Sequence, residues 1–173
     1  MTGFMHYASK PTVLDRSRVY TQDEPTTYGK PNGFWISASG PDDWPAWCLG
    51  GEFRLDTLRF AHTVTLAAGA YVLHLRTPAE LHYLHDMYAR PSDFDVRHGY
   101  GRRHWGIDWR NVARIFDGII ITPYQWSCRN DYDGGKTNWY YTWDCASGCI
   151  WNLDAIESVA PHHFPALTSG VPA

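Results

Sequence analysis

Short apolar segments separated by polar, glycine-containing or proline-containing stretches predict a series of short strands. Residues 4–7 (Phe-Met-His-Tyr) and 33–37 (Gly-Phe-Trp-Ile-Ser) are predicted as strands in the first part of the chain. The continuous apolar run at 118–122 predicts a buried strand that ends at Pro123. Residues 155–159 are predicted as a closing strand that follows an aromatic loop.

Alternating apolar and polar residues predict a pair of strands in the middle of the chain. Residues 62–66 and 71–75 both alternate, and the small residues 67–70 between them favour a turn. We therefore expect these two strands to pair with each other. Residues 10–32 are polar and are interrupted by prolines, which predicts mostly loop.

Capping residues mark the starts of three predicted helices. Thr77-Pro78-Ala79-Glu80 is a capping box with proline at the first helical position, and it predicts a helix that continues through Tyr88. Residues 39–43 (Ser-Gly-Pro-Asp-Asp) predict a short helix that ends at Gly50. Asp108 is predicted to cap a third helix, which runs to Asp117. Strands and short helices in this mixture predict an α+β fold.

Length and composition predict one domain over residues 1–160, followed by a C-terminal tail at 161–173. A chain of 173 residues is too short for two comfortable domains. With 44% hydrophobic and 19% charged residues, it is not expected to be disordered over long stretches. Aromatic residues are unusually frequent at 16%, and aromatic side chains in loops can stack on flat ligands such as bases or nicotinamide.

The charge pattern argues against tight nonspecific binding of duplex nucleic acid, because the net charge is −3. A local basic patch is still expected around Arg97, Arg102 and Arg103. No apolar run approaches the length of a membrane span, and residues 1–6 do not resemble a signal peptide. We therefore expect a cytoplasmic protein that does not bind a membrane.

Four cysteines are expected to be reduced thiols, since the sequence shows no secretory signal. They are Cys48, Cys128, Cys145 and Cys149. The spacing of Cys145 and Cys149 fits neither a redox pair nor a zinc knuckle, so no metal is expected.

The order of these segments resembles the ADP-ribosyltransferase superfamily, in its poly(ADP-ribose) polymerase and diphtheria-toxin branch. His6 resembles the histidine of that branch's first strand, and Trp35 its stacking aromatic residue. Residues 64–81 resemble a strand, turn, strand and helix of phage and bacterial members, and residues 116–120 and 149–156 resemble the closing strands. Small members from actinobacterial phages are similar, which implies a bacterial host cell.

The resemblance implies a split mixed β-sheet with short helices, and NAD as the substrate. His6 and Ser37 would hold the ribose, while Tyr7 and Trp35 would pack against nicotinamide. The family's catalytic glutamate is missing, because a gapless alignment of residues 149–156 puts Ser147 at its position.

Asp144 is the carboxylate nearest to that position, and an acid is needed there to stabilise an oxocarbenium-like transition state. The alternative interpretation is that Asp144 caps a turn. The resemblance thus makes Asp144 and Ser147 the candidate catalytic residues.

Two further segments are candidate substrate-binding elements. Tyr124, Gln125 and Trp126 lie in a predicted loop, where aromatic residues favour contact with a substrate. Arg102 and Arg103 lie in a basic and aromatic loop that is either solvated or binds phosphate.

Three functions are open from the sequence. The first is an NAD-dependent mono-ADP-ribosyltransferase that modifies a nucleic-acid base or a protein side chain. The second is a catalytically degenerate protein of the same fold that binds NAD, a nucleotide or a protein partner. The third is an unrelated phage interaction protein.

Overall fold

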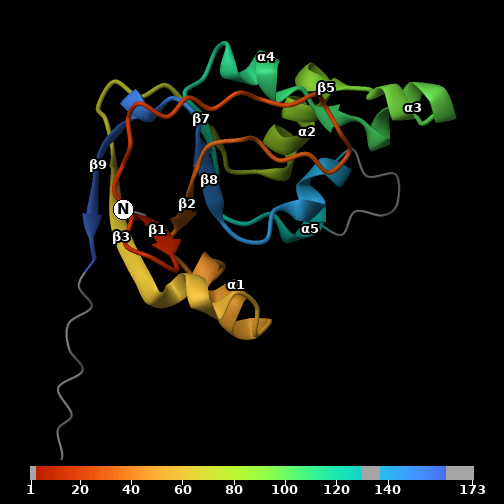
Figure 1. Cartoon of the computed structure of the whole chain (residues 1–173). Coiled ribbons are helices and arrows are strands. Elements are labelled where there is room, and N and C mark those ends of the chain that lie inside the picture. Colours follow the sequence, from red (N-terminus) through yellow and green to blue (C-terminus); the bar gives the residue numbers. More distant parts are fainter. Residues whose placement is uncertain (1–2, 130–136, 163–173) are drawn as a thin grey trace, which may run out of the picture.

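A seven-stranded mixed sheet forms the centre of the molecule, in a computed structural model that describes residues 3–129 and 137–162 (Figure 1). The strand order is β4-β7-β8-β2-β1-β3-β9. Only β4 and β7 are parallel, and the other neighbouring strands are antiparallel. The strands are β1 (Phe4–Ala8), β2 (Phe34–Ala38), β3 (Phe60–Leu66), β4 (Val72–Leu75), β7 (Gly118–Ile121), β8 (Ser147–Ile150) and β9 (Ile156–Pro161), and a separate two-stranded sheet contains β5 (Ala89–Arg90) and β6 (Gly106–Ile107).

The helices are short. Thr77 and Asp108 cap two of them as predicted, whereas the cap of the first helix is Asp43 and not Ser39, since Asp43 rather than Ser39 bonds to the first turn. The Asp43 carboxylate accepts a hydrogen bond from the Ala46 N–H at 2.9 Å, and Asp108 accepts one from the Asn111 N–H at 3.3 Å. Thr77 and Glu80 form the predicted capping box. The helices are α1 (Trp44–Gly50), α2 (Pro78–Tyr88), α3 (Asp93–His98), α4 (Trp109–Ala113) and α5 (Trp126–Arg129), with 3-10 segments η1 (Leu55–Arg59), η2 (Arg102–His104), η3 (Asn138–Thr142) and η4 (Leu153–Ala155).

Apolar side chains pack on both faces of the sheet, as the apolar run of β7 predicts. Ile119 and Ile121 belong to the larger core, whereas Ile120 belongs to the smaller core on the opposite face. The larger core includes side chains from α2, α4, α5 and η3, and Figure 1 shows α2 and α5 gathered to one side of β7 and β8. Three fully buried aromatic residues of this core come from the segment before β8: Trp139, Tyr140 and Trp143.

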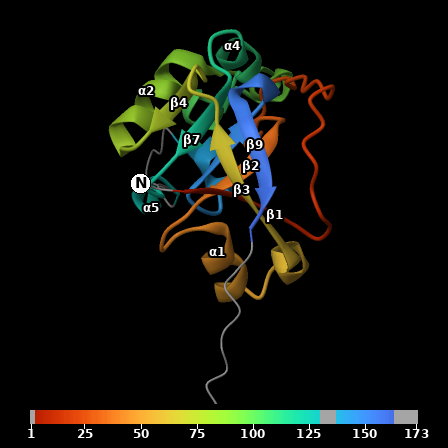
Figure 2. The same ribbon diagram turned by 90° about the vertical axis from the view of Figure 1, so that its left-hand side faces the viewer.

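The sheet opens between β1 and β2. These strands pair at only two positions, Phe4 with Ala38 and Met5 with Ser37. Beyond Met5, β1 continues to pair with β3, whereas β2 continues to pair with β8. Figure 2 shows β3 and β9 on the near side of the molecule, with β1 and β2 behind them. The two halves of the sheet therefore separate after the pair of Met5 and Ser37, so that His6 is the first residue of β1 in the opening.

The predicted hairpin of residues 62–66 and 71–75 is wrong. Both segments are strands and the turn between them forms, but β3 pairs with β1 and β9, and β4 pairs in parallel with β7. The physical reason is that β7, buried on both faces, offers β4 three isoleucines and Gly118 as partners. Alternation along a segment identifies a strand without identifying its neighbour.

Two other boundaries differ from the prediction. The helix capped by Asp108 ends at Ala113, and Ile115 beyond it is 52% exposed. Asp117 instead accepts a hydrogen bond from the Tyr71 N–H at 2.7 Å, which holds the start of β4 beside β7. Residues 149–156, which resemble a single strand, contain the end of β8, the turn η4 and the first residue of β9.

Two further predictions concern the C-terminal tail and membrane-spanning segments. Residues 163–173 of the predicted C-terminal tail lie outside the described residues. Across 3–129 and 137–162, no helix is long and apolar enough to cross a membrane.

Candidate functional site

A cavity of about 390 Å³ lies where β1 and β2 separate. Its walls come from these two strands, from the start of α1, from the segment around η1 and from the residues that enter β8. The volume falls in the range of small-molecule sites. We name this space the main cavity.

Six of the candidate residues line the main cavity, although they come from three separate stretches of sequence. Ser37 and Ser147 are register partners in β2 and β8, so strand pairing brings them side by side. The six are His6, Tyr7, Trp35, Ser37, Asp144 and Ser147.

His6 occupies the opening between the strands. Its Nδ1 lies 2.8 Å from the Trp35 carbonyl oxygen, and its ring stacks on Phe34 with 4.3 Å between centroids. Burial lowers the pKa of His6, the hydrogen bond to Trp35 opposes this change, and His62 adds to it. The imidazole is therefore neutral at pH 7.

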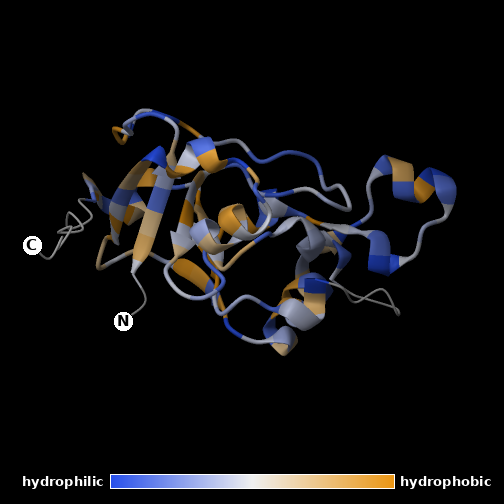
Figure 3. Ribbon diagram, turned by 90° about the horizontal axis from the view of Figure 1, so that it is seen from below, coloured by the Kyte–Doolittle hydropathy of each residue, from blue (hydrophilic) through white to orange (hydrophobic). Residues whose placement is uncertain are grey.

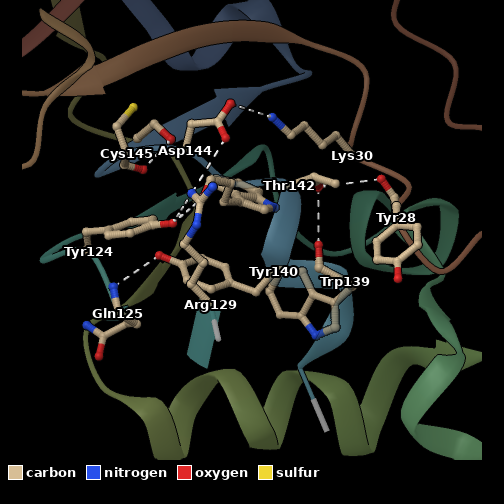
Figure 4. Close-up of polar contacts among 12 residues, drawn as sticks. Tyr28, Lys30, Tyr124, Gln125, Arg129, Trp139, Tyr140, Thr142, Asp144 and Cys145 are labelled. Carbon is tan, nitrogen blue, oxygen red and sulfur yellow. Dashed lines mark hydrogen bonds and ion pairs between the residues drawn. The ribbon is translucent and has the colours of Figure 1, made fainter. Parts of the chain in front are cut away.

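Asp144 lies between two cations (Figure 4). Its Oδ2 is 3.8 Å from Lys30 Nζ, and its Oδ1 is 3.6 Å from Arg129 Nη1. Burial lowers the pKa of Lys30, and the Asp144 carboxylate acts in the opposite direction. Lys30 Nζ also lies 5.4 Å from the centroid of the Trp35 ring. The cavity thus contains a carboxylate with a lysine and an aromatic face beside it.

Tyr124 and Gln125, which the sequence predicts as substrate contacts, are buried and bonded within the protein. The Tyr124 hydroxyl donates to the Trp143 carbonyl and accepts from Arg129 Nη1 at 2.7 Å (Figure 4). Burial raises the pKa of Tyr124 to about 12. Gln125 Nε2 donates to the Arg76 carbonyl at 2.9 Å. Tyr124 therefore supports the segment around Asp144, and neither residue lines the main cavity.

Trp126 lines a second cavity, of about 410 Å³, which shares Asp144 with the main cavity. The indole Nε1 of Trp126 donates to Asp42 Oδ1 at 3.1 Å. Trp47 and Asp43 also line this space. Asp144 therefore lines both cavities. The main cavity is mainly aromatic and basic, and the second cavity is aromatic and acidic.

Both serines of the site make hydrogen bonds to the backbone. Ser37 Oγ accepts from the Trp44 N–H at 2.9 Å, which ties β2 to the start of α1. Ser147 Oγ donates to the Cys145 carbonyl at 3.0 Å. Burial raises the pKa of the Cys145 thiol to about 12, so this cysteine is an unreactive part of the wall.

Several residues of the cavity wall were not predicted from the sequence. They are Lys30, Trp44, Phe53, Arg54 and Thr57. The sequence predicts Trp44 to be a core residue of α1. In the structure it lines the cavity, and its Nε1 donates to Thr57 Oγ1, which also lines the cavity, at 2.9 Å. Arg54 has a left-handed backbone, with φ of +48°, which is rare for a residue other than glycine. No local pattern marks these positions.

Arg102 and Arg103 lie in η2 and do not line the main cavity. Arg102 pairs with Asp86 at 4.0 Å, and Arg103 Nε donates to His104 Nε2 at 3.1 Å. Any role of these arginines is therefore separate from the main cavity.

In comparisons with known proteins, no family model, no curated protein and no solved structure matches this chain. The function is therefore inferred from the cavity and its side chains.

Proposed function

We propose that the protein binds NAD in the main cavity and transfers ADP-ribose to an acceptor, with Asp144 as the acid that stabilises the ribose cation. One observation carries this proposal: six residues that the resemblance selects, from three distant stretches of sequence, line one cavity. The opening of the sheet between β1 and β2 supports an ADP-ribosyltransferase-like split sheet. The proposed place of action is the cytoplasm of a bacterial host cell.

The chemistry of the cavity wall fits a dinucleotide. Tyr7 and Trp35 offer aromatic surfaces for a flat ring. Lys30 and Arg54 supply positive charge for a pyrophosphate. The neutral His6 exposes hydrogen-bonding capacity next to them, which suits a ribose hydroxyl.

Asp144 would act through its charge. NAD supplies a nicotinamide–ribose bond whose cleavage builds positive charge on the ribose. A carboxylate held close to that charge, in a partly buried site, stabilises it without having to reorganise. Lys30 and Arg129 hold Asp144 in one place, although they also offset part of its charge.

The acceptor would approach through the second cavity, because that cavity reaches the other side of Asp144. Trp47 and Trp126 provide flat surfaces there, which suit a base or a planar side chain. The proposed acceptor is a nucleic-acid base or a protein side chain.

A second candidate function is binding of NAD or a nucleotide without turnover. The observation that favours it is that Asp144 and Ser147 already have partners within the protein. Asp144 has two cationic neighbours, and Ser147 donates its hydroxyl proton to the Cys145 carbonyl. A carboxylate neutralised in this way stabilises a cation less well, while the rest of the cavity keeps its capacity to bind.

The two candidates differ in nicotinamide release. We would incubate the purified protein with NAD, alone and with mixed DNA, RNA and bacterial protein, and measure free nicotinamide and label transfer from adenine-labelled NAD. NAD binding is measured in parallel by calorimetry. Transferase activity predicts release that depends on one class of acceptor.

Asp144→Asn is expected to lower release by at least about 100-fold while calorimetry still detects NAD binding. Asp154→Asn is the matched control, because Asp154 is exposed and lies outside the main cavity. Binding without release by the unaltered protein would support the second candidate. Absence of both binding and release would overturn both candidates.

A further inference from the structure

An exposed segment of the chain projects from the fold far from the main cavity. Residues 93–105, which contain α3 and η2, form what we name the aromatic–basic arm. Figure 1 shows α3 at the far end of the molecule from β9, and Figure 3 shows apolar and polar residues mixed along the projecting helix. Every residue from Asp93 to Arg103 is exposed except Asp95, which is buried as part of the α3 capping box.

The arm carries a group of aromatic rings at its surface. Phe94 is 55% exposed and Tyr100 is 45% exposed. The rings of Phe94 and His98 have centroids 4.1 Å apart, and those of Tyr100 and His104 are 5.2 Å apart. Phe94 and Tyr100 are themselves 5.7 Å apart. The four rings therefore support one another at the surface without entering either core of the sheet.

Charged side chains of both signs accompany these rings: three arginines, together with the exposed Asp93 in the first turn of α3. Arg97, Arg102 and Arg103 lie in the arm, and all three are exposed. Arg102 is anchored, because it pairs with Asp86, donates to the Asp86 carbonyl and lies 5.9 Å from the Trp105 ring. Within residues 3–129 and 137–162, neither Arg97 nor Arg103 forms an ion pair with a carboxylate. Two guanidinium charges next to exposed rings are thus without a carboxylate partner among the described residues, although Arg103 Nε donates to His104 Nε2.

The two ends of the arm are fixed by a pair of strands. β5 precedes the arm, β6 follows it, and the two strands pair with Ala89 opposite Ile107 and Arg90 opposite Gly106. The indole N–H of Trp105 donates to the Tyr100 carbonyl at 3.2 Å, which closes the loop between α3 and η2. A prearranged surface of this kind loses little conformational entropy when a partner binds.

We propose that the aromatic–basic arm is a binding surface for single-stranded nucleic acid. Exposed rings stack with unpaired bases whatever their sequence, and arginines beside them contact the phosphates. A duplex hides the faces of its bases, so it can satisfy the arginines but not the rings. The overall charge of −3 gives no general attraction to nucleic acid, so binding depends on this local patch. The proposal does not rest on NAD binding or turnover.

Fluorescence anisotropy with labelled oligonucleotides tests this proposal. The probes are a mixed-sequence single strand of about 16 nucleotides, as DNA and as RNA, and the matching DNA duplex. The unaltered protein is expected to bind a single strand at least about tenfold more tightly than the duplex at low salt. Affinity is expected to fall as salt rises from about 50 to about 200 mM.

Two pairs of substitutions separate the contribution of the rings from that of the charges. Phe94→Ala with Tyr100→Ala is expected to weaken single-strand binding at least about tenfold and to leave the salt dependence unchanged. Arg97→Ala with Arg103→Ala is expected to weaken binding and to reduce the slope of log affinity against log salt by about 1.4.

Matched controls keep the result specific to the arm. Arg59→Ala with Arg114→Ala removes the same charge from exposed positions elsewhere, and Tyr71→Ala removes an exposed ring outside the arm. These variants are expected to bind within about twofold of the unaltered protein. The proposal is overturned if no oligonucleotide binds, if the duplex binds as tightly as the single strand, or if the control variants lose as much affinity as the arm variants.

Discussion

The Nδ1 atom of His6 lies 2.8 Å from the carbonyl oxygen of Trp35, next to the last residue pair that β1 and β2 share. A carbonyl oxygen can only accept, so in this contact Nδ1 carries the proton of the neutral imidazole. A side chain therefore bridges the strands where their backbone pairing ends. Nε2 is then the acceptor nitrogen of a side chain that lines the main cavity.

Substituting His6 is expected to change how stability depends on pH. Burial lowers the pKa of folded His6 below its ordinary value of 6.5, so the unfolded chain takes up the proton first as the pH falls. The free energy of unfolding of the unaltered protein should therefore fall as the pH drops below about 6.5 and level off below the folded pKa. His6→Gln lacks this contribution, and urea unfolding at about pH 8 and about pH 5 measures the difference.

The control for this prediction is His98→Gln, which changes an exposed histidine. His74, whose pKa is also lowered by burial, is present in all three proteins and cancels in the comparison. An equal pH dependence in the unaltered protein and in His6→Gln would contradict the prediction.

Arg129→Met is expected to lower the free energy of unfolding by about 2–4 kcal/mol. The substitution removes one of the two cationic partners of Asp144, the donor to the Tyr124 hydroxyl and a cation 4.4 Å from the Trp47 ring centroid. The side chain is only 14% exposed. Chemical denaturation measures the change. Arg59→Met, at an exposed position, is the control and is expected to cost less than about 0.5 kcal/mol.

A double-mutant cycle tests the pairing of Arg129 with Asp144 directly. Arg129→Met and Asp144→Asn together should cost less than the sum of the two single changes, because each removes the same ion pair. Strict additivity would show that the two side chains do not interact.

Gly106→Ala is expected to destabilise the fold by about 3 kcal/mol. A Cβ atom at this position would lie 1.9 Å from the carbonyl oxygen of Thr26, so the segment before β2 would have to move away from β6. Thermal unfolding provides the measurement. Gly101→Ala is the matched control, because nothing lies within 4 Å of a Cβ atom there. A similar melting temperature for the two variants would disprove the close approach.

Cys145 is expected to resist alkylation in the native protein at about pH 8, because its buried thiol has a pKa of about 12 and thiols react as thiolates. Iodoacetamide treatment followed by peptide mass spectrometry measures labelling at each cysteine. The same treatment in concentrated guanidinium should label all four. Rapid native labelling of Cys145 would show that this wall of the main cavity opens to solvent.

Much of the local structure could be predicted because its causes are local. The caps at Thr77 and Asp108 depend on groups within three residues of each other. β7 could be predicted because a continuous run of isoleucines is typical of a strand that is buried on both faces. The partner of β4 could not be predicted from the sequence, because several apolar strands were available and alternation does not distinguish among them.

Some residues of the candidate site could be selected from the sequence, and others could not. His6, Tyr7, Trp35 and Ser37 could be selected by resemblance, since each lies in a short segment with a recognisable pattern. Lys30 and Arg54 could not be selected, because each stands in a polar segment that carries no pattern of its own. Tyr124 and Gln125 were predicted to contact a substrate, yet their burial depends on η3, which packs against α5.

The sequence by itself determined the capped starts of α2 and α4 and the positions of β1, β2, β3, β4 and β7, since hydrophobic period and capping act between near neighbours. Only the tertiary structure decided that β1 and β2 separate at His6, that Asp144 lies between Lys30 and Arg129, and that Phe94 and Tyr100 remain exposed. The physical reason is that these relationships depend on strand register and on contacts between residues far apart in the chain, whose energies are set only when the whole sheet forms.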